Sequence, residues 1–311
     1  MNTHGLDRYL GVLEDKNSNV LKKEIMGKNY DECLKDIEVN VNESAGWLVH
    51  GNNSARTEGM CCVLQDQNLF FDNGENKCNH CNSAKKTVDH LATRCGRMLN
   101  SSYLRRHNEV VKCLHFHLCR QYGIRKTKKL KTYSVQSVVA NEVVEIRVDT
   151  TISTDTAVSN NKPDIFVHDK MRNTITLIEV GITSQNFLKQ VEVEKFHKYD
   201  FLANELGAIH RAKVKIIPFV LTWDGIVSRI FKSHLDSIAV EDRVAAYIQT
   251  LGLRKTLESM QVETRHGISV SEEEQAVIEC QPKDNSESGI RVDEDLYVPT
   301  MIVGHKRRRS F

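Results

Sequence analysis

The sequence has no apolar run that approaches the roughly 18 residues of a membrane-spanning helix. Its N-terminus also lacks the apolar core of a signal peptide. These two absences predict a protein without a membrane partner that works in the reducing nucleus, with the cytoplasm as a second compartment.

The sequence also has little net charge. The formal value is +2, so binding to nucleic acid must rest on local basic patches. Two patches are present: Arg120, Arg125, Lys126, Lys128, Lys129 and Lys131 form the first, and Lys306, Arg307, Arg308 and Arg309 form the second. The first is typical either of a solvated loop or of a phosphate-binding surface. The second is typical of a nuclear-import signal.

The chain is long enough for one large or two modest domains. It has 311 residues, of which 40% are hydrophobic and 27% charged, as in ordinary globular proteins. We expect an ill-defined N-terminal segment over 1–45, a linker with a metal-binding knuckle over 46–100, and an α/β domain over 101–262. The polar and acidic residues 263–311 predict a disordered tail.

Four of the possible metal ligands are spaced as Cys-x2-Cys-x8-His-x4-Cys, at Cys78, Cys81, His90 and Cys95. Zinc prefers four such donors in a tetrahedron, and a zinc bound here would be structural. It would supply folding energy on the order of 10 kcal/mol. The alternative is a set of free cysteines with a surface histidine. The sequence predicts buried thiols at Cys61, Cys62, Cys113 and Cys119.

A helix is predicted to begin at Tyr103, with Ser102 as its cap. One face of it carries His107 among apolar residues, while Arg105 and Arg106 fall outside that face. His107 is either a hydrogen-bonded core residue or a residue that stands near a phosphate.

An alternating pattern from residue 142 predicts a half-buried strand, followed by a loop over 150–161. Asp164 opens a second strand over 165–167, a turn covers 170–173, and residues 174–180 form a central third strand. A single helix is predicted over 186–206. A fourth strand over 213–221 contains Pro218, which indicates that the strand lies near a sheet edge or ends its pairing there. Helices are predicted over 226–239 and 241–258.

Two acids and a lysine stand out in this α/β segment. If the second and third strands are neighbours, the carboxylates of Asp164 and Glu179 can face one Mg²⁺ or Mn²⁺ ion. Lys195 on the following helix would supply a cation for the transition state, with Lys198 and Tyr199 beside it. The alternative is that Asp164 caps a turn and that Lys195 forms a surface pair with Glu192 or Glu194.

This α/β segment resembles the PD-(D/E)XK, or restriction-like, nuclease fold in the variant whose lysine has moved to the following helix. Gly181 stands where the unmoved lysine would be. More specifically, residues 45–240 resemble the C-terminal part of site-specific LINE-type (non-LTR) retrotransposon polyproteins. The matching pieces are Gly51-Asn52, Thr57-Glu58-Gly59, Gln65-Asp66-Gln67, the Cys-Cys-His-Cys knuckle, Arg106-His107-Asn108, Lys162-Pro163-Asp164, Glu179 and Glu194-Lys195-x-x-Lys198-Tyr199.

The resemblance implies a mixed central sheet flanked by helices and preceded by a CCHC zinc knuckle. It also implies a magnesium-dependent endonuclease that nicks double-stranded target DNA to prime reverse transcription of the element RNA. Asp164, Glu179 and Lys195 match the catalytic positions, although relatives often carry aspartate at the second acid. The candidate nucleic-acid contacts are Arg105, Arg106, His107, Arg125, Lys126, Lys128 and Lys129.

A reverse-transcriptase palm would carry a paired-aspartate motif, and this sequence has none of the Ala/Tyr-x-Asp-Asp kind. The chain is therefore not expected to copy RNA. Two alternatives to an active nuclease stay open: a nucleic-acid-binding remnant with an inactive site, and a domesticated protein that uses the fold to bind a partner.

Overall fold

The computed structural model describes residues 34–267, apart from 52, 67–76, 79, 125–129 and 131, with side chains as far as residue 260. The predicted disordered tail over 263–311 is wrong at its start, because residues 263–267 form the end of a helix that runs to Gly267. The rest of the tail, both ends of the chain and the basic residues Arg125, Lys126, Lys128, Lys129 and Lys131 lie outside the described residues. Among the described helices, none combines the length and apolar character that crossing a membrane requires.

The chain forms two compact units, each built from separated segments. The described part of unit 1 comprises residues 34–110, 179–198 and 217–267, and that of unit 2 comprises 111–178 and 199–216. The domain boundaries expected near 45, 100 and 262 remain predictions.

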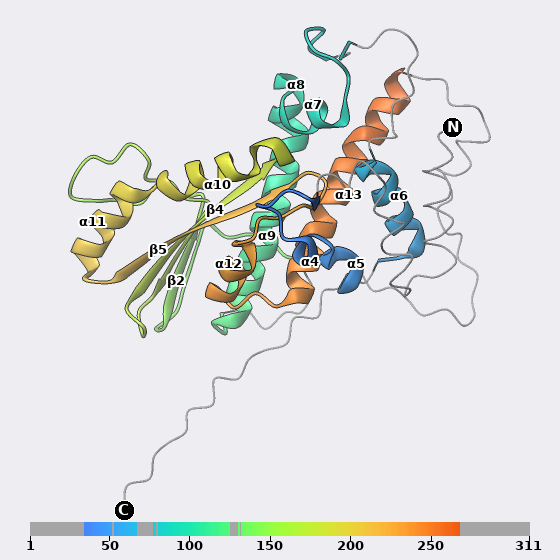
Figure 1. The fold of residues 1–311 in the computed structure, drawn as a ribbon. Helices are drawn as coiled ribbons and strands as arrows, with labels where there is room; N and C mark the ends of the chain where they lie inside the picture. Colours follow the sequence, from blue (N-terminus) through green and yellow to red (C-terminus); the bar gives the residue numbers. More distant parts are fainter. Residues whose placement is uncertain are drawn as a thin grey trace, which may run out of the picture. The chain divides into compact units, whose positions relative to one another are not determined.

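The elements follow one another as an α/β chain (Figure 1). The helices are α4 (Val41–Ser44), α5 (Gly46–Val49), α6 (Ala55–Gln65), α7 (Val88–Thr93), α8 (Gly96–Met98), α9 (Leu104–Gln121), α10 (Leu188–His197), α11 (Asp200–His210), α12 (Phe231–Ser237) and α13 (Asp242–Gly267), with a π-helical turn at Leu99–Tyr103 and a 3-10 turn at Gln185–Phe187. The strands are β1 (Val138–Ala140), β2 (Val144–Val148), β3 (Ile165–Asp169), β4 (Thr174–Thr183) and β5 (Lys213–Thr222).

The five strands form one mixed sheet in the order β1-β2-β3-β4-β5, which confirms the expected α/β class with a mixed sheet and flanking helices. The first four strands are antiparallel neighbours. Strands β3 and β4 pair with Ile165 opposite Ile178 and Phe166 opposite Leu177. β5 lies at the sheet edge, as Pro218 predicts, because an edge strand tolerates the missing N–H of proline.

In unit 2, helix α11 covers one face of the sheet. Its residues Leu202 and Leu206 pack with Phe166 and Leu177 in one buried cluster. Phe166 and Leu177 are register partners, so their side chains stand side by side on one face.

In unit 1, the long helix α13 packs against α5, α6 and α7 (Figure 1). A separate buried cluster joins Leu188 of α10 to Val220 of β5 and to Ile226, with Val191 packed against it. This cluster fixes the inner face of α10.

Several helices differ from their predicted bounds. Ser102 does not cap the helix predicted from Tyr103, because it lies inside the π-helical turn that precedes α9. Helix α12 is shorter than the predicted 226–239, and α13 runs past 258 to Gly267. The single helix expected over 186–206 is broken after α10, and Asp200 starts α11, where an acidic residue suits the positive end of the helix dipole. The sequence also indicates a loop over 51–59 and a helix over 61–71. Helix α6 instead begins at Ala55, because the Ser54 side chain accepts the Thr57 N–H and caps it, so residues 55–59 are helical.

Candidate functional site

The first candidate site is a buried carboxylate held by two lysines. Oε1 of Glu179, on β4, lies 2.9 Å from Nζ of Lys195 and 2.6 Å from Nζ of Lys198. The Glu179 side chain is 4% exposed, and Lys195 is 21% exposed. A buried carboxylate is costly unless it is paired, and the two ammonium groups supply that compensation.

The inner face of α10 brings Lys195 to this carboxylate. Leu188 and Val191 lie three residues apart and pack into the unit 1 core. Lys195 is one turn beyond Val191, so its stem follows the same face. The sequence correctly placed Lys195 on the apolar face of the helix. Within the described part of the chain, Lys195 pairs with Glu179, whereas Glu192 accepts from Ser228 and Glu194 accepts from Gln190.

A glycine makes room for that lysine. A Cβ atom on Gly181 would lie 3.0 Å from Cε and 3.2 Å from Cδ of Lys195, and 3.2 Å from Cγ2 of Val220. In the sequence, Gly181 stands out only as the position without a lysine. A glycine inside a β-branched strand often marks the close approach of another group, and that signal could have predicted the space for Lys195.

Asp164 lies at the start of β3 in unit 2 and is half-buried. Its carbonyl oxygen accepts the N–H of Asp149 at 3.1 Å, and Asp149 pairs with Lys162 at 2.7 Å. Tyr199 was predicted to belong to the catalytic set. It is 1% exposed and donates its hydroxyl to the carbonyl oxygen of Lys162 at 2.9 Å, so it holds the segment that leads into Asp164.

The second candidate site is the predicted knuckle, which the structure brings together within unit 1. One ligand atom from each of Cys78, Cys81, His90 and Cys95 lies within 4.8 Å of the others. Sγ of Cys78 is 3.8 Å from Sγ of Cys95, and Sγ of Cys81 is 3.3 Å from Nε2 of His90. These four residues therefore could hold a metal ion such as zinc.

The separations fit the tetrahedral zinc geometry. With zinc–sulfur bonds of about 2.3 Å and zinc–nitrogen bonds of about 2.0 Å, a tetrahedron places two sulfurs about 3.8 Å apart and a sulfur and nitrogen about 3.5 Å apart. Both observed distances are close to these edges. Thr87 starts α7 by accepting the His90 N–H at 3.0 Å, which fixes the turn that carries the histidine.

The thiols of the knuckle differ in their acidity. The hydrogen bond from Ser83 lowers the pKa of Cys81 to about 5, whereas burial raises the pKa of Cys78. A thiolate is the form that binds metal, so the lowered pKa of Cys81 favours this residue as a ligand. By contrast, burial raises the pKa of Cys61, and Cys61, Cys62, Cys113 and Cys119 are buried as predicted.

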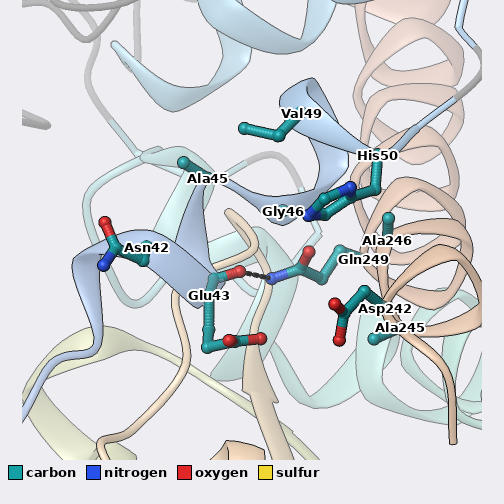
Figure 2. Close-up of a pocket in the computed structure, with 10 residues that line it drawn as sticks. All are labelled: Asn42, Glu43, Ala45, Gly46, Val49, His50, Asp242, Ala245, Ala246 and Gln249. Atoms are coloured by element: carbon teal, nitrogen blue, oxygen red, sulfur yellow. Dashed lines mark hydrogen bonds between the residues drawn. The ribbon is translucent and has the colours of Figure 1, made fainter.

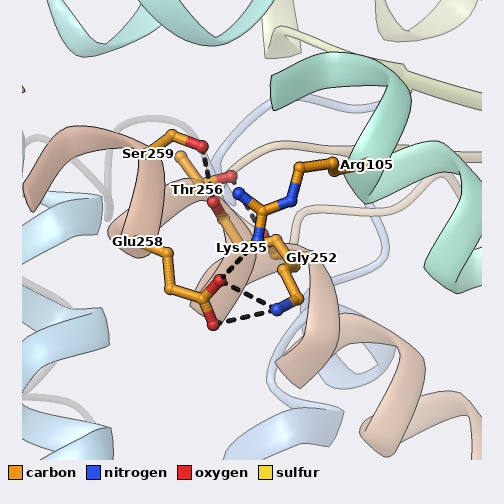
Figure 3. Close-up of polar contacts among 6 residues, drawn as sticks. All are labelled: Arg105, Gly252, Lys255, Thr256, Glu258 and Ser259. Carbon is orange, nitrogen blue, oxygen red and sulfur yellow. Dashed lines mark hydrogen bonds and ion pairs between the residues drawn. The ribbon is translucent and has the colours of Figure 1, made fainter. Parts of the chain in front are cut away.

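Two of the predicted nucleic-acid contacts on α9, Arg105 and His107, contact other side chains of the protein. Arg105 is exposed and reaches Glu258 of α13 at 3.4 Å, where Lys255 also pairs with Glu258 (Figure 3). His107 is half-buried and lies 3.3 Å from the side-chain oxygen of Asn108. Both residues keep part of their surface open to solvent.

Arg106 does not fit the prediction of a surface contact outside the apolar face. It is 1% exposed, and its guanidinium donates to the carbonyl oxygen of Ala92 in the last turn of α7. The last carbonyls of a helix lack helical partners, which explains why a buried donor ends there. Nε and Nη1 of Arg106 have no hydrogen-bond partner within the described part of the chain, and burial lowers its pKa to about 10.

Unit 1 also contains a cavity of about 290 Å³ beside α5 and the start of α13 (Figure 2). Its lining includes Glu43, His50, Asp242 and Gln249. Gln249 donates to the carbonyl oxygen of Glu43 at 2.7 Å. None of the residues that the sequence singled out for chemistry lines this cavity.

No model of a known protein family matches this chain, and no curated protein matches it.

Proposed function

We propose that this chain is the metal-dependent DNA endonuclease region of a non-LTR type retrotransposon, with a PD-(D/E)XK core. It would act in the nucleus and nick double-stranded target DNA. The new 3′ end would then prime reverse transcription of the element RNA. The observation that carries this proposal is the buried Glu179 carboxylate held by Lys195 and Lys198.

The order of the strands supports a role for Asp164. Phe166 and Leu177 are partners on one face of the β3–β4 pair. Asp164 directly precedes β3 and Glu179 lies on β4, and these strands are neighbours in the order of the sheet. Carboxylate oxygens are the ligands that a hard cation such as Mg²⁺ prefers.

Each residue then has a definite part. Asp164 and Glu179 would hold Mg²⁺ or Mn²⁺, which when bound lowers the pKa of a coordinated water and offsets phosphate charge. Lys195 places an ammonium group beside the carboxylate, where it can stabilise a phosphate oxygen as charge develops. Lys198 shares this carboxylate, and Tyr199 acts by holding the Lys162–Asp164 segment.

A plasmid-nicking assay with magnesium tests the proposal. We expect Asp164→Asn and Lys195→Met to lower the nicking rate by at least about 100-fold, because electrostatic contacts in such sites are worth that much. Lys189→Met is the matched control. Lys189 lies on the same helix, is exposed, and pairs with Glu38 at 2.6 Å.

The control should nick at nearly the native rate, and all the variants should bind DNA like the native chain. If Asp164→Asn and Lys195→Met nick as fast as Lys189→Met, the catalytic assignment is wrong.

One observation favours a second candidate, a nucleic-acid-binding remnant with an inactive site. The two ammonium groups already compensate Glu179, so this carboxylate does not need a cation to be stable. That candidate predicts DNA binding by the native chain without nicking in either magnesium or manganese.

A further inference from the structure

The knuckle contains two charged residues that are not metal ligands but stand directly beside them. Asp89 precedes His90 and Arg94 precedes Cys95. Both belong to α7 or its end, and they pair with each other at 2.9 Å. Their positions therefore depend on the same short helix that carries the histidine ligand.

Asp89 joins this helix to the end of the sheet in unit 1. Its Oδ1 accepts the indole N–H of Trp223 at 3.1 Å. Trp223 follows β5 directly, is buried, and donates its backbone N–H to the carbonyl oxygen of Thr183 at 2.9 Å. Thr183 ends β4, the strand that carries Glu179.

Arg94 joins the same helix to the start of α10. Its guanidinium carbon lies 5.2 Å from the centre of the Phe187 ring, within the range of a cation–π contact. Phe187 is the residue from which α10 begins, and it has no side-chain cap of its own. The contact with Arg94 therefore acts where α10 is least held by its own hydrogen bonds.

We propose that metal binding in the knuckle fixes the start of α10, and with it Lys195, through Asp89 and Arg94 as positioning residues. Helix α7 has six residues, which is too short to persist in water without support. Binding of the metal by His90 and Cys95 supplies that support. The held helix then fixes Trp223 through Asp89 and Phe187 through Arg94. The consequence for catalysis rests on the proposed function, whereas the effect on α10 does not.

Hydrogen exchange of the backbone amides, followed by mass spectrometry on the full chain, tests the link without any measurement of activity. Removing the metal with a chelator should speed exchange in peptides from α10 by about two- to tenfold, because opening of a locally held segment sets this rate. Adding zinc back should restore the slow rate. Peptides from α11 should show no such change.

Two variants keep the test valid if chelation unfolds more than the knuckle. Zinc-loaded Asp89→Ala and Arg94→Ala should keep one zinc, since neither residue is a ligand, yet exchange faster in α10 by about two- to fivefold. Arg97→Ala is the matched control. Arg97 is an exposed arginine two residues after Cys95, and it should leave α10 unchanged.

The proposal is overturned if α10 exchanges equally with and without zinc. It is also overturned if Asp89→Ala and Arg94→Ala behave like Arg97→Ala. A chain that shows the exchange effect but never nicks DNA would refute the proposed function and leave this link intact.

Discussion

The space beside Gly181 is filled by the stem of Lys195, whose Cε would lie 3.0 Å from a Cβ atom at that glycine. Contacts this short force a neighbour to move. The neighbours here are the lysine stem on one side and the Val220 side chain, a member of the unit 1 core, on the other.

Gly181→Ala is therefore expected to displace Lys195 from Glu179. Overpacking of this kind costs about 1–3 kcal/mol of unfolding free energy. We also expect the nicking rate to fall by about tenfold or more, since small misplacements of a catalytic group are costly. Chemical denaturation and the plasmid assay measure the two effects.

Gly207→Ala is the matched control for this substitution. Gly207 lies inside α11, and a Cβ there would meet its neighbours at 3.6 and 3.7 Å, which is ordinary contact. Alanine favours a helix over glycine by about 1 kcal/mol, so this variant should be as stable as the native chain or more stable. Equal behaviour of the two variants would contradict the steric account.

Asp224 should make stability fall as the pH rises. Burial raises the pKa of its carboxyl to about 6 from an ordinary value of 3.8, against the opposing hydrogen bond from Thr222. Between these two values the folded chain binds more protons than the unfolded chain, so folding is favoured at low pH and the advantage is lost above pH 6. The shift corresponds to about 3 kcal/mol.

Asp224→Asn removes the titration and leaves an oxygen that can accept from Thr222. The difference in unfolding free energy between variant and native chain should change in favour of the variant by about 2 kcal/mol between pH 4 and pH 8. Denaturant titrations at several pH values measure it. A difference that stays constant with pH would show that Asp224 does not titrate in this range.

The knuckle should bind one zinc per chain by metal analysis. Replacing Cys78 and Cys81 together by serine should remove the zinc and lower the melting temperature, because ligation contributes on the order of 10 kcal/mol to such small modules. Cys62→Ala should keep the metal, since Cys62 is a buried thiol of α6. A double variant that retained its zinc would refute the site.

Local patterns were sufficient where one face of an element is buried. The alternation of Val144, Ile146 and Val148 predicted β2, and the β-branched run after residue 173 predicted β4. The spacing of the four knuckle ligands predicted their convergence, because cysteine and histidine at these intervals have few other uses. The cost of a lysine on an apolar face predicted that Lys195 is paired or used, but not that its partner is Glu179.

Tertiary contacts decided what the sequence did not reveal. No local sequence pattern predicts that Arg106 donates a hydrogen bond to a carbonyl oxygen of α7, or that Arg105 of α9 pairs with Glu258 of α13. The break between α10 and α11 was missed because the apolar spacing continues through it, although Leu188 and Leu202 belong to different clusters. The contact of Trp223 with Asp89 spans 134 residues and has no sequence signature.

That break has a consequence for how the chain tolerates changes in length. Lys198 reaches the Glu179 carboxylate, while its immediate neighbour Tyr199 reaches the Lys162 carbonyl oxygen. One peptide bond thus separates two anchors, and an inserted or deleted residue would have to release one of them. Connections between helices usually accept insertions, but this one should be among the least permissive places in the chain.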